Sequence, residues 1–146
     1  MYENILIPVD GSEVSDNAAR QGFELASRLG SKVTLFYAVD ISILTAPGAE
    51  SAMANVNVMR ASLKEQADSL MASMKETAAA SGIEPETLVA EGNVSDEIVR
   101  AANEKGADLI VMGTHGRRGF NRLLIGSVAE SVSRKAHCPV LLIRPA

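Results

Sequence analysis

The chain has 146 residues, with 14 Lys and Arg side chains against 18 Asp and Glu, which gives a net charge of −4. A chain of this length is expected to form one domain over residues 1–146, built around a single core. The acidic balance argues against a general nucleic-acid binder, which normally presents a basic surface. With no Trp, two Tyr and three Phe, the chain also lacks the side chains for a base-stacking platform.

Three further features of the composition bear on the compartment. No run approaches the roughly 18 apolar residues that a membrane-spanning helix needs. Residues 1–4 lack the basic region of a secretory signal, and no signal-like apolar stretch with a cleavage site follows them. Cys138 is the only cysteine, so the chain can form neither an internal disulfide nor a multi-cysteine metal site. These features predict a reducing, cytoplasmic location.

Short apolar runs alternate with helical periods along the whole chain. The runs predict strands at residues 5–9, 33–39, 87–90, 108–112 and 140–143. The periodic segments predict helices at residues 13–29 and 56–78, a third opened by Ser95 as N-cap, and a fourth that carries Val128, Val132 and Ala136. Because these strands are apolar throughout, they are expected to be buried on both faces, as in a parallel sheet covered by helices. The order predicts a doubly wound α/β domain.

Local signals punctuate this pattern. Gly30 and Gly82 are expected to end the first two helices, and Gly113 to break the fourth strand. Pro8 is an objection to the first strand, because proline cannot donate to a sheet ladder. It lies one residue from the carboxyl end of that strand, where the chain leaves the ladder. The strand is therefore retained.

Ligands of an open parallel sheet bind beyond the carboxyl ends of the strands, where the winding reverses. Asp10 follows the first strand and Gly113 the fourth, so both are expected to face one crevice. The pattern G-x2-G-x9-G-[ST] matches at Gly113, Gly116, Gly126 and Ser127. Glycines let a ligand approach the backbone, and the start of a helix at Gly126 offers unpaired N–H groups to an anion. The loop therefore predicts a phosphate site.

The sequence resembles the universal stress protein family, from the residues 5–12, ILIPVDGS, to the residues 138–143, CPVLLI. In that family the glycine pattern marks the branch that binds ATP. The resemblance implies a five-stranded parallel sheet ordered 3-2-1-4-5. It also implies pairing of two copies through the last strand, Val140, Leu141, Leu142 and Ile143, whose apolar edge would otherwise be exposed.

The resemblance also assigns roles residue by residue. Pro8, Val9 and Asp10 would line the adenosine side, and Asp10 would reach the ribose or a phosphate-bound Mg²⁺ or Mn²⁺. Ala38 matches the position whose backbone meets adenine, although the family more often has valine there. The ribose and phosphates would be surrounded by Met112, Gly113, Gly116, Gly126, Ser127 and Val128. His115 and Arg117, inside the same loop, complete the predicted nucleotide contacts.

Several of these residues have a second, structural interpretation. Asp10 could cap the first helical turn, and the loop arginines 117, 118 and 122 could be solvated. His115 could equally be exposed to solvent. His137 and Cys138 are not expected to form a catalytic dyad, because neighbours in a strand point to opposite faces.

Valine at Gly113 or Gly116 is expected to abolish binding without unfolding the chain, and Ser127 is expected to cap its helix.

These observations predict an ATP-binding protein that acts as a nucleotide-dependent stress regulator or sensor. The alternative is a slow, metal-dependent ATPase or phosphotransferase of the same fold, since metal and backbone donors can support hydrolysis. No residue of the glycine loop is a committed general base. A flavodoxin-like FMN carrier is disfavoured, because five aromatic residues leave little to sandwich a flavin.

Overall fold

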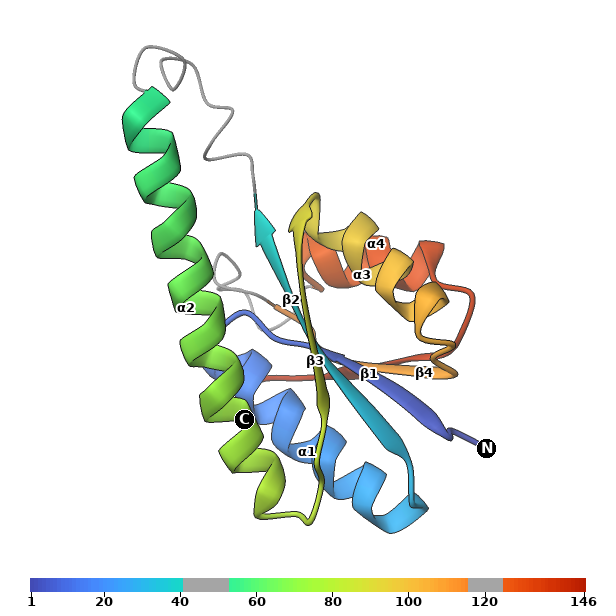
Figure 1. The fold of residues 1–146 in the computed structure, drawn as a ribbon. Coiled ribbons are helices and arrows are strands. Elements are labelled where there is room, and N and C mark those ends of the chain that lie inside the picture. The colour runs from blue at the N-terminus through green and yellow to red at the C-terminus, as the bar shows by residue number, and fades with distance from the viewer. Residues whose placement is uncertain (41–52, 116–124) are drawn as a thin grey trace.

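The computed structural model describes residues 1–40, 53–115 and 125–146 (Figure 1). Strands and helices alternate in the order β1 (Asn4–Pro8), α1 (Glu13–Leu29), β2 (Lys32–Asp40), α2 (Met53–Ala79), β3 (Glu86–Gly92), α3 (Val94–Glu104), β4 (Leu109–Gly113), α4 (Ser127–Lys135) and β5 (Val140–Ile143). The described strands form one five-stranded sheet in the order β3-β2-β1-β4-β5, and every neighbouring pair is parallel. The predicted fold class and strand order are confirmed.

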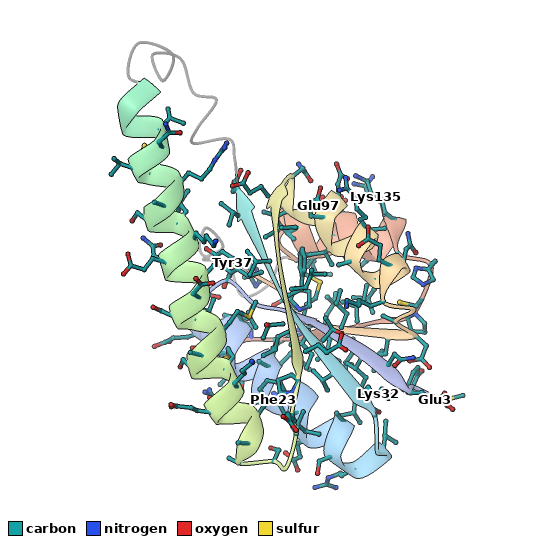
Figure 2. The ribbon with its side chains drawn as sticks, viewed as in Figure 1. Glu3, Phe23, Lys32, Tyr37, Glu97 and Lys135 are labelled. Atoms are coloured by element: carbon teal, nitrogen blue, oxygen red, sulfur yellow. The ribbon has the colours of Figure 1, made fainter. Side chains whose placement is uncertain are left out.

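Helices cover both faces of the sheet, as Figure 1 shows, and each face has its own apolar layer. Alternate side chains of a strand point to opposite faces. Ile5 and Ile7 of β1 therefore pack with Phe23 of α1 and with α2, whereas Leu6 packs with Ile98 of α3 and with α4. Figure 2 shows Phe23 between α1 and the sheet. Burial on both faces explains why the inner strands β1, β2 and β4 are apolar runs in the sequence. The expectation is wrong for the edge strands β3 and β5, in which no residue is fully buried.

Helix α1 begins and ends as the sequence predicts. The side chain of Ser12, its N-cap, accepts a hydrogen bond from the Ser15 N–H group. Gly30 ends the helix with a φ of 70°, a left-handed conformation that glycine adopts without a steric penalty. Pro8 is the last residue of β1, so the strand tolerates the proline but ends one residue earlier than predicted, and Val9 still donates to the Phe36 carbonyl.

Several boundaries differ from the predictions by one to three residues, and three of the differences concern residues near the site. Strand β3 spans seven residues, all paired with β2, because polar residues such as Glu86 are tolerated on an edge strand with one neighbour. Gly113 belongs to β4 rather than interrupting it, and pairs with Ile143. Helix α3 is capped by Asn93, not by Ser95. The Asn93 side chain accepts from the Asp96 N–H group and from the Ser95 hydroxyl.

Asp108 lies just before β4 rather than in it, and its side chain ties the starts of two strands together. Its carboxylate accepts hydrogen bonds from the backbone N–H groups of Glu3 (2.9 Å) and Asn4 (3.0 Å). Burial alone would raise the pKa of Asp108, but these backbone donors outweigh burial and lower that pKa.

None of the helices in the described residues is both long and apolar enough to cross a membrane.

Candidate functional site

A cleft of about 750 Å³ opens at the carboxyl edge of the sheet. The ends of β1, β2 and β4 form its floor, and the first turns of α3 and α4 form part of its walls. It lies where the winding reverses, because β1 has β2 on one side and β4 on the other. Its volume falls within the range of about 300–1,000 Å³ that is typical of small-molecule sites.

Ten of the twelve predicted nucleotide contacts line this cleft: Pro8, Val9, Asp10, Ala38, Met112, Gly113, His115, Gly126, Ser127 and Val128. The other two, Gly116 and Arg117, lie outside the described residues, as do Arg118 and Arg122. The structure thus brings together residues from three strands, one helix and the segments next to them, which span most of the chain.

Asp10 is held in place by the turn between β1 and α1. Its Oδ1 atom accepts a hydrogen bond from the Ser12 N–H group (2.9 Å), and its own N–H group donates to the Ser15 hydroxyl (2.9 Å). The capping role that the sequence left open for Asp10 belongs to Ser12. The other carboxylate oxygen, Oδ2, makes no hydrogen bond to the described residues. Asp10 therefore combines a fixed orientation with one oxygen that can meet a ligand.

Gly126 holds the start of α4 against the end of β4. Its N–H group donates to the Thr114 carbonyl over 2.7 Å, and a Cβ atom at Gly126 would stand 2.9 Å from that same oxygen. Any residue can adopt its φ of −66°. Glycine is therefore required here by the short distance to the Thr114 carbonyl oxygen and not by the backbone angle. Gly126, and not Ser127 as predicted, is the N-cap, and it supplies no side-chain hydrogen bond. The first-turn N–H groups of α4 are therefore left for solvent or a ligand.

Gly113 lines the cleft, but a side chain at this position would point toward α1. A Cβ atom there would lie 2.7 Å from Cγ1 of Val14 and 3.3 Å from the Val14 carbonyl oxygen, both in α1. Gly113 is not among the glycines with positive φ. The expectation that a side chain at Gly113 would intrude on the ligand and spare the fold is therefore wrong. This glycine is required by the packing of α1 on β4.

His115 is buried, with 7 % of its surface exposed, so a solvent-exposed role is excluded. Its Nδ1 atom lies 2.9 Å from the Thr114 hydroxyl, while Nε2 has no hydrogen-bond partner among the described residues. Thr114 is also buried and was not singled out from the sequence; its N–H group donates to the Ile143 carbonyl. An unpartnered buried ring nitrogen in a cleft wall is a group that a ligand can satisfy.

A second wall of the cleft was not predicted from the sequence. It consists of Asn93, Val94, Ser95 and Asp96 at the start of α3, and of Ser131 and Lys135 on α4. Lys135 Nζ lies 2.9 Å from Asp96 Oδ1, so an ion pair joins the two helices. A usable signal was present, because Asn93 follows a predicted strand and the start of a helix after a parallel strand falls at the carboxyl edge.

His137 and Cys138 lie before β5 and not in it, so the strand argument against a dyad does not apply. Neither residue lines the cleft. Cys138 packs against the apolar layer of α3 and α4. Burial, together with the negative charge of Asp108, raises the pKa of its thiol, so the reactive thiolate is disfavoured. This environment suits a small, partly buried apolar side chain.

The sequence model of the Universal stress protein family matches residues 1–144. The chain belongs to this family. Universal stress protein MJ0531 of Methanocaldococcus jannaschii is 40 % identical over 144 residues, which cover 99 % of this chain and 83 % of that protein. Universal stress protein YxiE of Bacillus subtilis is 29 % identical over 148 residues, with 99 % and 100 % covered.

Solved structures show the same fold. Protein MJ0577 of Methanocaldococcus jannaschii has a TM-score of 0.87 at 29 % identity, and the match covers 100 % of this chain and 98 % of that one. A universal stress protein in complex with cAMP has a TM-score of 0.76 at 22 % identity and covers 99 % of both chains. One from Archaeoglobus fulgidus in complex with dAMP has 0.66 at 23 %, with 98 % of both chains covered.

Proposed function

We propose that this protein binds ATP in the cleft and acts as a nucleotide-dependent regulator or sensor of the stress response in the cytoplasm, through a protein partner that reads its ligand state. The observation that carries the proposal is the convergence of Asp10, His115 and the uncapped start of α4 on one cleft. Two members of the same fold were solved with the adenine nucleotides cAMP and dAMP, which supports a nucleotide as the ligand class.

In the proposed complex the adenosine lies at the ends of β1 and β2, against Pro8, Val9, Asp10 and Ala38. The phosphates lie toward Gly113 and the start of α4, where the N–H groups of Ser127 and Val128 are available. Helix N-termini favour anions, because unpaired N–H groups and the helix dipole point the same way. Gly116 and Arg117 remain predicted contacts from the glycine pattern.

A divalent cation, Mg²⁺ or Mn²⁺, fits this site as a companion of the phosphates. Within the described part of the chain, no group of three or more His, Cys, Asp or Glu side chains is arranged to hold a metal. Mg²⁺ is commonly held by one or two carboxylates together with substrate phosphates, and Asp10 can supply one such oxygen. The cation would neutralise phosphate charge beside this carboxylate.

Isothermal titration with ATP, with and without Mg²⁺, tests the proposal. We expect a dissociation constant in the low-micromolar range or tighter, improved by the cation, which fits a site that supplies several charge-assisted hydrogen bonds. Mass spectrometry of the small molecule that co-purifies with the protein gives independent evidence on the ligand. Absence of heat and of thermal shift at millimolar ATP contradicts the proposal. Release of phosphate from bound ATP would indicate the rival slow ATPase instead.

The proposal includes a homodimer that forms through β5. This strand is at one edge of the sheet, and its Leu141 side chain is 42 % exposed. Exposed apolar edges pair or aggregate unless they are covered.

Light scattering is expected to report at least twice the 15.4 kDa chain mass. Leu141→Lys should yield monomer, whereas Val89→Lys, at a similarly exposed position of edge strand β3, should not. A monomeric parent at micromolar concentration contradicts the proposed dimer.

A further inference from the structure

The described wall of the cleft carries more negative than positive side chains. Asp10, Asp40 and Asp96 line it, whereas Lys135 is the one Lys or Arg side chain in its described lining. The arginines at 117, 118 and 122 lie outside the described residues. A polyphosphate that enters the described cleft therefore meets a single ammonium group in the described lining. Because opposite charges attract at short range, the placement of that ammonium group affects how strongly phosphates are held.

Lys135 lies on the same side of α4 as the proposed phosphate position. Ser127, Ser131 and Lys135 are spaced by four residues, so they share one face of the helix, and all three line the cleft. Lys135 is in the last turn of α4, and long side chains on a helix lean back toward its N-terminus. Its ammonium group lies beside Asp96, in the same cleft that the uncapped start of α4 lines.

In this structure Asp96 holds Lys135 with an Nζ–Oδ1 distance of 2.9 Å. The pair joins the first turn of α3 to the last turn of α4, and Figure 2 shows Lys135 near Glu97, which is also in the first turn of α3. The two side chains are 50 % and 58 % exposed, and ion pairs with such exposure are weak. A phosphate group carries more charge than one carboxylate and can replace it as the partner of an ammonium group.

We propose that Lys135 is a phosphate-binding residue of the cleft and that Asp96 competes with the ligand for it. A nucleotide phosphate takes Lys135 from Asp96 when it binds. Asp96 thereby lowers the affinity for phosphorylated ligands and leaves the affinity for the uncharged nucleoside unchanged. The inference rests on the proposed nucleotide function, and it adds two residues on α3 and α4 that set the discrimination between nucleotide and nucleoside.

The test compares ATP with adenosine by isothermal titration in Mg²⁺ at low ionic strength. For Asp96→Asn we expect ATP to bind about 3–10-fold more tightly, and for Lys135→Gln about 3–10-fold more weakly, as for the gain or loss of one charged contact. Adenosine should change by less than about two-fold in both variants. The double variant restores the net charge of the parent. It should nevertheless bind ATP as weakly as Lys135→Gln.

A matched ion pair at the opposite edge of the sheet serves as the control. Lys105 Nζ lies 3.1 Å from Glu86 Oε2, between the end of α3 and the start of β3, and neither residue lines the cleft. Glu86→Gln and Lys105→Gln change the net charge by the same amounts as the two cleft variants. Each should alter ATP affinity by less than about two-fold, because distant exposed charges are screened.

Any one of the following results overturns the inference. The first is equal effects of Asp96→Asn and Glu86→Gln, which would reflect net charge alone. The second is adenosine affinity that changes together with ATP affinity, and the third is a double variant that binds like the parent. If the parent binds ATP and the cleft variants do not differ from it, only this inference fails. If the parent binds neither ligand, the proposed function fails with it.

Discussion

The two edges of the sheet differ in how their polar groups are satisfied. At the amino edge, Asp108 accepts from the backbone N–H groups of Glu3 and Asn4, where the first strand begins, and the Ser31 hydroxyl donates to the Tyr2 carbonyl. At the carboxyl edge, α4 begins without a side-chain cap, and His115 Nε2 has no partner in the described residues. Figure 2 shows Glu3 and Lys32 at the amino edge.

This difference separates stability from binding in one small fold. Both edges are built from the same strands, and their backbone groups have the same needs. Hydrogen bonds within the chain meet these needs at the amino edge, so substitutions there should change the free energy of unfolding. At the carboxyl edge some donors are left for a ligand, so substitutions there should change affinity. The predictions below test that separation.

Gly126→Ala should have the largest effect on binding. The new Cβ atom would stand 2.9 Å from the Thr114 carbonyl oxygen, so the start of α4 must move away from β4. We expect a loss of ATP affinity of about 100-fold and of stability of about 1–3 kcal/mol, as for other overpacked sites. Titration and a thermal melt measure the two effects.

Gly30→Ala is the control for this substitution. A Cβ atom at Gly30 meets nothing within 4 Å, but the left-handed φ of 70° disfavours alanine. Stability should fall by about 1 kcal/mol and ATP affinity should not change. Equal affinity losses for Gly126→Ala and Gly30→Ala would contradict the separation.

Gly113→Ala should act on stability even though Gly113 lines the cleft. Its Cβ atom would overlap Cγ1 of Val14, and we expect a cost of about 1–3 kcal/mol in the free energy of unfolding. Val14→Ala removes that methyl group, so the double variant should be more stable than the sum of the two single changes indicates. Chemical denaturation of the three variants measures the coupling. Strict additivity would show that the contact with α1 is not the cause.

Ser127→Ala should act on affinity alone. Because Gly126 is the cap, loss of the Ser127 hydroxyl should change stability by less than about 0.5 kcal/mol. ATP affinity should fall about ten-fold, the value of one charge-assisted hydrogen bond. Ser133→Ala, on the same helix but with its hydroxyl bonded to the Ala129 carbonyl, should leave affinity unchanged. A loss of stability with no loss of affinity would reverse the role assigned to Ser127.

Asp108→Ala should have the smallest effect, a loss of about 1 kcal/mol of stability at neutral pH with no change in ATP affinity. The folded pKa of Asp108 is lowered, so its contribution is present above the unfolded pKa of about 3.9 and is lost as the pH falls through the folded pKa. The difference between parent and variant should therefore shrink in acid. Denaturation series at pH 7 and pH 3 measure it, and a constant difference would contradict the assignment.

The succession of elements could be predicted from the sequence, because strands buried on both faces are unbroken apolar runs and α1 has clear end signals. Strand β3 was predicted too short, since an edge strand with one neighbour keeps polar residues such as Glu86 and Glu91. The strand order came from the family resemblance. Periodicity describes which face of an element is buried but not which element lies beside it.

The composition of the cleft could be predicted better than the contacts within it. The glycine pattern located the start of α4, yet it could not show that Gly113 packs on Val14, a residue 99 positions earlier in the chain. The start of α3 could have been placed at the cleft, because it follows a predicted parallel strand. The burial of His115, by contrast, depends on the same kind of long-range packing as the contact between Gly113 and Val14. Such contacts follow from the assembled sheet and leave no local signal in the sequence.

The chemical-shift change of each backbone amide on addition of ATP and Mg²⁺ tests the central claim most directly. We predict the largest changes at Asp10, Gly113 and Ser127, with no change at Glu3 or Lys105 at the opposite edge. Changes concentrated at the amino edge, or no changes at saturating ATP, would contradict the assignment of the carboxyl edge as the nucleotide site.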